Sequence, residues 1–374
     1  MINLAIRRSV LPGRQLLTGS WPRTRSGVHP RTCSFRTLLS STADDNSSST
    51  SNSSGNKRLE YQHAFHAGNF ADVFKHVMLV MLLQRMILPK NKSMSYVETH
   101  AGAGLYELAD TSSTDYEKEH QRGVWQLLDL IHQKDPGDLP ESVVTYLDIV
   151  RSFQVPQKED APTRLIYPGS PLFAASLLAK QQSPQTSTIQ HSMHLYEKFP
   201  APLDLLRHHL DEYLAATSNS NSIDTFLHCD DGYKGLTKYA QSTSSLPPRA
   251  LILLDPPYQY GSDTDQIVAT CRALRQHWRS ARIVIWHPVR PDHADKLERL
   301  YRMLGAENDD EILAVEVYAP SSSDDDRKPD VGTGMIMIQP PYGMDTECQQ
   351  VLPTLWKMLH PSSDAQHAIQ IRWL

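Results

Sequence analysis

Two short apolar segments constrain the fold of this chain more than any other feature of its 374 residues. Residues 250–254 (ALILL) and 282–286 (RIVIW) have the length of strands, and residues 267–278 between them have a helical pattern. A strand that is apolar on both sides has to be buried on both faces, as in a parallel sheet that helices cover. We therefore predict an α/β fold with a doubly wound, Rossmann-like sheet.

Alternating strands and helices continue this pattern along much of the chain. The stretch from residue 105 to 165 interrupts it, because it is polar, helical in pattern and broken by prolines, and we predict a small helical insertion there. The last two strands, 312–318 and 334–338, are expected to form an antiparallel pair. The other expected strands are 94–98, 194–196 and 225–228, and the other expected helices are 70–86, 170–180, 201–216 and 291–304.

The composition of the chain changes near residue 58. The first 43 residues contain no acidic residue and are rich in Arg, Ser and Thr, which is typical of an organellar transit peptide. Residues 46–56 contain only Ser, Thr, Asn and Gly, so we expect a flexible spacer there. We assign residues 1–57 to a transit peptide and spacer and residues 58–374 to the folded domain, with a disordered basic arm as the alternative. The Arg enrichment favours the mitochondrion over the plastid, and the cytoplasm is a further alternative.

The folded domain carries a negative net charge. The first 58 residues hold nine basic and two acidic side chains, about +7, while the whole chain has a net charge of −5. The remainder therefore carries about −12, which argues against broad, non-specific binding of nucleic acids. A local basic patch from Lys57, Arg58 and Lys75 could still meet RNA. Four widely spaced cysteines favour neither a disulfide framework nor a thiolate zinc site, and no apolar run is long enough to cross a membrane.

The sequence Asp255-Pro256-Pro257-Tyr258 directly follows the apolar strand 250–254. Such folds place their sites at the carboxyl ends of parallel strands, and two prolines make the turn rigid. The Asp255 side chain and the Pro256 carbonyl can both accept hydrogen bonds from one exocyclic amine, while the Tyr258 ring can stack on its base. This turn predicts transfer of a methyl group to an amine, and a coincidental proline-rich loop is the alternative.

Residues 100–104 (HAGAG) follow the expected strand 94–98. Small residues such as Gly102 let the backbone approach a ligand closely, and we expect a helix after them that presents free amides. A tight turn without a ligand would have the same pattern. A dinucleotide is less suitable as the ligand, because Glu107 stands where G-x-G-x-x-G needs its third glycine.

Two further motifs are interpreted as structural. Residues 339–342 (QPPY) repeat the proline turn, but they lie far downstream at an expected sheet edge. His63, His66 and His76 are close in sequence, yet a Gly-Asn pair interrupts the spacing that a shared metal site would need. We therefore expect no metal.

Five motifs occur along the chain in an order that one enzyme family shares. They are HAFHAGNFADVFKH (63–76), THAGAG (99–104), YPGSP (167–171), DPPY (255–258) and GTGMIMIQPPY (332–342). Together they closely resemble the ribosomal RNA large subunit methyltransferase J family, whose members use S-adenosylmethionine to methylate N6 of one adenine in 23S ribosomal RNA. The resemblance runs from about residue 59 to the C-terminus. The bacterial-type family has no basic leader, so the chain resembles an organelle-targeted version.

The resemblance implies roles for individual residues. Asp255 matches the catalytic aspartate, with Pro256 and Tyr258 in the same turn, and Tyr61 matches a tyrosine that contacts the target nucleotide. Lys75, from the basic patch, is also expected to meet the RNA. The implied cofactor is S-adenosylmethionine, and the implied partner of a monomeric enzyme is large-subunit ribosomal RNA before full assembly. The implied cofactor contacts are His76, His100, Gly102, Ser170, Glu197, Asp231, Gly232 and Asp255.

Other functions stay open at this point. The methylated amine could belong to a DNA adenine, another RNA or a protein glutamine. The chain could also be a non-catalytic RNA-binding assembly factor that keeps the fold, or a Rossmann dehydrogenase. The intact DPPY and THAGAG motifs favour the catalytic interpretation.

Overall fold

The computed structural model describes most of the predicted folded domain. The described residues are 66–87, 92–109, 116–131, 138–154, 164–180, 189–217, 222–258, 262–307, 311–320, 331–362 and 368–374. The predicted transit peptide and spacer, residues 1–57, lie outside the described residues, as does Tyr61.

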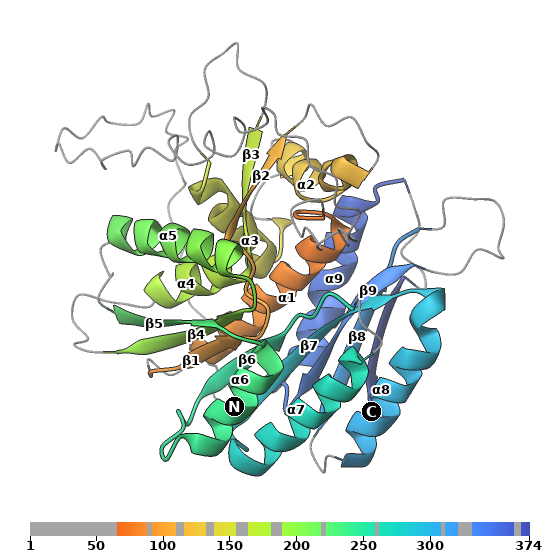
Figure 1. The fold of residues 1–374 in the computed structure, drawn as a ribbon. Coiled ribbons are helices and arrows are strands. Elements are labelled where there is room, and N and C mark those ends of the chain that lie inside the picture. Colours follow the sequence, from red (N-terminus) through yellow and green to blue (C-terminus); the bar gives the residue numbers. More distant parts are fainter. Residues whose placement is uncertain are drawn as a thin grey trace, which may run out of the picture. The chain divides into compact units, whose positions relative to one another are not determined.

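An eight-stranded sheet forms the centre of the fold, in the order β10-β8-β9-β7-β6-β1-β4-β5 (Figure 1). Five strands run parallel, namely β1 (Ser95–Glu98), β4 (His191–Glu197), β5 (Ile223–Cys229), β6 (Ala250–Leu254) and β7 (Ala281–Val289). The other three pair in antiparallel fashion, namely β8 (Ile312–Tyr318), β9 (Gly332–Ile338) and β10 (Ile369–Trp373). The predicted parallel core and the antiparallel pair 312–318 and 334–338 are therefore confirmed.

Helices cover both faces of this sheet (Figure 1). On one face lie α6 (Gly232–Ser242), α7 (Asp263–His277) and α8 (Ala294–Glu307), and a short 3-10 helix, η5 (Pro291–His293), precedes α8. On the other lie α1 (Phe70–Ile87), α4 (Ser170–Lys180), α5 (Pro200–Ala216) and α9 (Met344–Leu359). Strand β6 is buried on both faces, since Leu251 and Leu253 pack into one core while Ile252 and Leu254 pack into the other. This explains why its sequence is apolar throughout.

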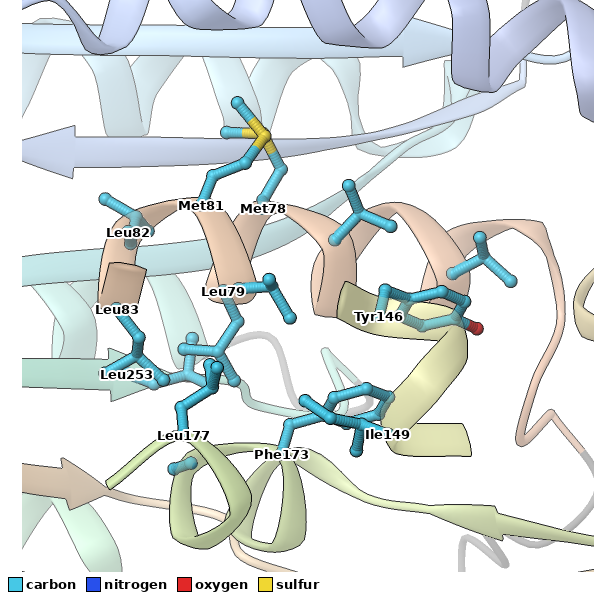
Figure 2. Close-up of a cluster of buried hydrophobic side chains, with 14 of the residues drawn as sticks. Met78, Leu79, Met81, Leu82, Leu83, Tyr146, Ile149, Phe173, Leu177 and Leu253 are labelled. Atoms are coloured by element: carbon cyan, nitrogen blue, oxygen red, sulfur yellow. The ribbon is translucent and has the colours of Figure 1, made fainter. Parts of the chain in front are cut away.

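Helix α1 is buried along almost its whole length. Its apolar residues do not form one stripe, because the helix packs against other elements on several sides. Figure 2 shows Leu79 on the side that faces Phe173 and Leu177 of α4, while Met78 and Met81 point the opposite way. Its buried polar side chains, Asp72, Lys75 and His76, are therefore held in fixed positions.

The insertion between residues 105 and 165 contains helices, but strands frame it. Strand β2 (Leu105–Ala109) pairs in antiparallel fashion with β3 (Arg164–Pro168), and between them lie η2 (Tyr116–Arg122), α2 (Val124–Ile131) and α3 (Glu141–Ser152). The expectation of a helix directly after the glycine-rich turn is therefore wrong. Tyr106 and Leu108 are buried while Leu105 and Glu107 are half-buried, which is the period-two alternation of a strand.

The C-terminal elements α9 and β10 were not expected. Helix α9 carries Pro353 in its interior, which disguises its helical pattern, and β10 is only five residues long. Within the described part of the chain, no helix combines the length and apolar character that crossing a membrane requires.

Shortening a buried side chain of α1 should lower the stability of the protein. Leu79 is 1% exposed, so we expect Leu79→Ala to lower the free energy of unfolding by about 2–5 kcal/mol through lost burial and a residual cavity. Leu205 of α5 is 38% exposed, and Leu205→Ala, the matched control, should cost less than about 1 kcal/mol. Denaturant titration of both variants measures the difference, and equal losses would contradict the packing described here.

Candidate functional site

Asp255 lies at the carboxyl end of β6, where α1 meets the sheet. Its Oδ2 atom is 2.7 Å from Nζ of Lys75, which projects from the second turn of α1. The same ammonium lies 2.9 Å from Oδ1 of Asp72, one turn earlier in the helix. One buried lysine therefore joins two carboxylates that are far apart in the sequence.

The charge on Lys75 is retained although its side chain is only 3% exposed. Burial by itself disfavours the ammonium, but the charges of Asp255 and Asp72 outweigh it and raise the pKa of Lys75 well above its ordinary value. The ammonium also lies 5.6 Å from the centre of the Trp286 ring. From the sequence we expected Lys75 to be part of a surface basic patch. The structure shows that this expectation is wrong, because Lys75 is buried. Its contact with RNA stays a prediction.

The turn after β6 is held rigidly against β7. Tyr258 has a positive φ of 53°, and its hydroxyl donates to the carbonyl of Trp286 at 2.8 Å. Its ring meets the Trp286 ring edge-on at 5.9 Å, while Pro256 is buried. The positive φ is rare for a residue with a side chain, so the surrounding contacts must hold it in place. Stacking of Tyr258 on a base stays a prediction.

The described part of the HAFHAGN motif, from His66 onward, shapes the start of α1, and His63 lies outside the described residues. Asp72 accepts a hydrogen bond from the backbone amide of Gly68 at 3.1 Å, and its own amide donates to Asn69 at 3.0 Å. Asn69 and His66 both contact Glu119 of η2, at 2.9 and 3.0 Å. This hydrogen bond to Glu119 raises the pKa of His66. The motif therefore positions Asp72 beneath Lys75, and no group of three possible metal ligands comes together among the described residues.

The glycine-rich turn after β1 is fixed by Glu197, at the end of β4. Gly102 and Gly104 both have positive φ, 64° and 86°, where a side chain would be strained. The Glu197 carboxylate accepts hydrogen bonds from the amides of Gly102, at 3.0 Å, and Phe199, at 2.9 Å. Two predicted cofactor contacts, Gly102 and Glu197, therefore meet, and the carboxylate keeps further lone pairs for a ligand.

A further acid, Glu98, lies at the end of β1, and its sequence position did not lead us to predict a role for it. It is fully buried, and it accepts hydrogen bonds from the hydroxyls of Tyr96, at 2.8 Å, and Ser170, at 2.5 Å. Burial is the main cause that raises the pKa of Glu98 to about 8, so the carboxyl group is largely protonated at neutral pH. The sequence did contain a signal for this residue, because Glu98 ends strand β1 and Asp255 directly follows strand β6, so both acids lie at the carboxyl ends of strands.

Ser170 is the first residue of α4, and its hydroxyl bonds to Glu98. His76 is 1% exposed, lies 2.7 Å from the Tyr167 hydroxyl and stacks on Phe173 with ring centres 4.7 Å apart. The roles of Ser170 and His76 toward the cofactor stay predictions.

The remaining predicted contacts surround the end of β1. His100 lies edge-on to Tyr233 at 5.2 Å, and burial lowers its pKa to about 4, so the imidazole is neutral. Asp231 caps α6 by accepting from the amide of Lys234 at 3.3 Å. A Cβ atom at Gly232 would lie 2.0 Å from the carbonyl oxygen of Thr99, so only glycine permits this close approach.

The second proline turn, after β9, lies at the opposite edge of the sheet. Ile338 pairs with Ile283 near the start of β7, whereas the end of β6 pairs with Ile285. Arg275 donates to the Gln339 side chain at 3.3 Å, which agrees with the structural interpretation of this motif.

Comparison with known proteins identifies the family. A family model described as "Ribosomal RNA large subunit methyltransferase D, RlmJ" matches residues 91–374. Two relatives described as "Ribosomal RNA large subunit methyltransferase J" are each 31% identical to this chain. The one from Haemophilus influenzae aligns over 83% of this chain and 98% of its own length, and the one from Escherichia coli over 84% and 99%. The chain belongs to the ribosomal RNA large subunit methyltransferase J family.

The family's fold is also that of a solved structure. A crystal structure of a protein from Legionella pneumophila matches with a TM-score of 0.62 at 23% sequence identity, over 83% of this chain and 98% of that chain. Membership of the family makes this chain a methyltransferase and S-adenosylmethionine its cofactor.

The residues around the glycine-rich turn fit this cofactor. Glu197 already accepts a hydrogen bond from the amide of Gly102, and its remaining lone pairs can accept hydrogen bonds from ribose hydroxyls. A neutral His100 does not repel the positive charge of a sulfonium group. Glu197 and His100 therefore agree with the chemistry that the cofactor needs.

The buried carboxyl group of Glu98 should make stability depend on pH. Its pKa is raised on folding, so the folded state keeps a proton that the unfolded chain loses, and stability should fall as the pH rises from about 4.5 to about 8. Glu98→Gln imitates the protonated acid and should remove this loss.

Thermal unfolding of both proteins between pH 5 and pH 8 measures the effect. The advantage of Glu98→Gln over the wild type should grow with pH, while Glu298→Gln, at an exposed position on α8, should show a constant difference. An advantage of Glu98→Gln that does not change with pH would show that the carboxyl group is not held in its protonated form.

Proposed function

We propose that this methyltransferase transfers a methyl group to N6 of an adenine in large-subunit ribosomal RNA. The observation that carries the proposal is the position of Asp255, at the sheet edge in a rigid Pro-Pro turn and beside the glycine-rich turn of β1. The names of the Haemophilus influenzae and Escherichia coli relatives support ribosomal RNA as the substrate.

The turn after β6 offers two acceptors to one amine. Oδ2 of Asp255 is bound by Lys75, and its other carboxylate oxygen makes no hydrogen bond within the described residues. That oxygen and the Pro256 carbonyl can each accept one N–H of an exocyclic amine, which directs the nitrogen lone pair away from the turn. A ring nitrogen without two N–H groups would leave one acceptor unused, so the pair selects an amine.

Asp255 can also accept the proton that the amine loses on methylation. S-adenosylmethionine supplies, when bound, an electrophilic methyl group. The amine nitrogen would form a bond to the methyl carbon while the carbon–sulfur bond breaks and leaves its electron pair on sulfur, so that a neutral thioether departs. The nitrogen would then give up one proton, which the free oxygen of Asp255 can accept. Lys75 keeps this carboxylate in a single orientation, because the lysine is itself fixed by Asp72 and by the buried helix α1.

The recessed carboxylate limits which RNA can react. The side chain of Asp255 is only 11% exposed, so the target adenine has to leave its stack, at a cost of roughly a few kcal/mol. We therefore propose that the substrate is ribosomal RNA before full assembly, when the target is not covered by proteins. We further propose that the enzyme acts as a monomer, since all the groups named above come from one chain, and that it works in the mitochondrion, as the basic leader suggests.

Replacing the catalytic carboxylate should abolish turnover without abolishing cofactor binding. We expect Asp255→Asn to lose at least about 100-fold in methyl transfer, since it removes the proton acceptor and an orienting oxygen. Asp211→Asn, which changes an exposed acid on α5, is the matched control and should stay near wild-type activity.

The assay uses labelled S-adenosylmethionine and protein-free large-subunit ribosomal RNA, followed by digestion to nucleosides. Label in N6-methyladenosine that is lost in Asp255→Asn is the expected result. Label in another nucleoside, or in a DNA or protein substrate only, would overturn the proposed substrate. Full activity of Asp255→Asn would overturn the role of the aspartate.

A further inference from the structure

Positive charges gather where β6 and β7 begin, at the sheet edge opposite to the one that carries Asp255. Arg249 directly precedes β6, while Arg282 is the second residue of β7. Because these two strands are adjacent and parallel, both arginines lie at the same edge of the sheet. Arg279 lies in the turn before β7, and the exposed Lys92 precedes β1, the other neighbour of β6. We call these four basic residues the basic edge.

Hydrogen bonds join the segments that carry these side chains. Arg249 donates to the carbonyl oxygen of Lys92 at 3.4 Å. The indole of Trp278, beside Arg279, donates to the carbonyl oxygen of Pro247 at 2.8 Å, which ties the turn before β7 to the segment before β6. The four charges therefore belong to one continuous part of the surface.

No acid compensates the basic edge within the part of the chain that the structure describes. None of its four side chains forms an ion pair there, and Arg249 donates only to neutral carbonyl oxygens, those of Met86 and Lys92. The Nε atom of Arg282 is buried and has no hydrogen-bond partner among these residues. Burial, and then repulsion by Arg282, lower the pKa of Arg249, so the charge that acts on this arginine is a like charge.

Cations at the catalytic edge of the sheet lie beside acids instead. Arg290, which follows β7, pairs with Asp292 at 2.9 Å, and Lys198, which follows β4, lies 4.0 Å from Asp231. Like charges that repel one another cost stability, and the folded domain as a whole is acidic. A group of uncompensated cations on such a domain is typical of a surface that meets an anion.

Ribosomal RNA is a polyanion much longer than this sheet is wide. Strand β6 has five residues, so about 17 Å separates its two ends, and one RNA molecule can contact both edges at once. Arginine and lysine side chains without acidic partners bind phosphate groups through charge and hydrogen bonds. We propose that the basic edge holds the phosphate backbone of a second segment of the ribosomal RNA, apart from the segment that delivers the target adenine. This inference rests on the proposed function.

Two arginines of the basic edge are suited to a test. Arg279 is exposed and Arg282 half-buried, and neither side chain makes a hydrogen bond with the described residues. Arg279→Gln combined with Arg282→Gln removes both charges, and the corresponding pair of changes to Lys retains them. Arg249 stays unchanged, because its side chain also binds the end of α1. The matched control combines Arg151→Gln with Arg207→Gln, at exposed positions on α3 and α5.

The full chain is tested with protein-free large-subunit ribosomal RNA. We expect the Gln pair at 279 and 282 to weaken RNA binding about five- to twentyfold and to reduce its salt dependence by roughly one to two phosphate contacts. The KM for RNA should rise by a similar factor, while kcat and the affinity for S-adenosylmethionine stay unchanged, because the basic edge lies away from Asp255. The Lys pair should restore binding, and the control should match the wild type.

Thermal unfolding of each variant shows whether it is folded as the wild type is. An RNA affinity and salt dependence of the Gln pair equal to those of the control would overturn the inference. A loss confined to the binding of phosphatidylserine vesicles would overturn it as well, because the basic edge would then meet a membrane surface and not RNA.

Measuring RNA binding and methyl transfer on the same variants separates this inference from the proposed function. If the wild type binds the RNA without methylating it, the proposed function fails, and the comparison of the Gln pair with the control still decides the role of the basic edge. If the wild type methylates the RNA and the two variants bind it equally, only the basic edge is excluded. A wild type that does not bind the RNA overturns both.

Discussion

The ammonium of Lys75, shared between Asp72 and Asp255, is the interaction on which the candidate site depends. It connects helix α1, which is buried along almost its whole length, to the turn that carries the catalytic carboxylate, across 180 residues of sequence. Removing one partner of such a buried group leaves a charge without compensation, which costs far more than losing a surface pair. The HAFHAGN motif supports the arrangement from below, because Gly68 and Asn69 hold Asp72 in position.

The other buried ionisable groups of the site also avoid an unpaired charge. Glu98 is largely protonated at neutral pH and His100 is neutral, so each of these buried groups avoids an unpaired charge by its protonation state. Lys75 avoids one by pairing.

Much of this architecture follows from local sequence patterns, because apolar strands and proline turns are local features. The DPPY turn after β6 was placed correctly by this logic. The strand after Gly104 was mistaken for a helix, since five residues with one charged side chain carry too little periodicity to decide. Lys75 was expected at the surface, because its two partners become visible only when α1 packs against the end of β6. Glu98 was missed for a related reason, since burial and not sequence context determines its protonation.

A double-mutant cycle between Lys75 and Asp255 tests the central claim most directly. The free energy of unfolding would be measured by denaturant titration for the wild type, Lys75→Met, Asp255→Asn and the double variant. If the two groups form a direct buried pair, the losses of unfolding free energy in the two single variants should add up to about 1–3 kcal/mol more than the loss in the double variant. Additive losses would contradict the account, because they would show that α1 and the catalytic turn are positioned independently.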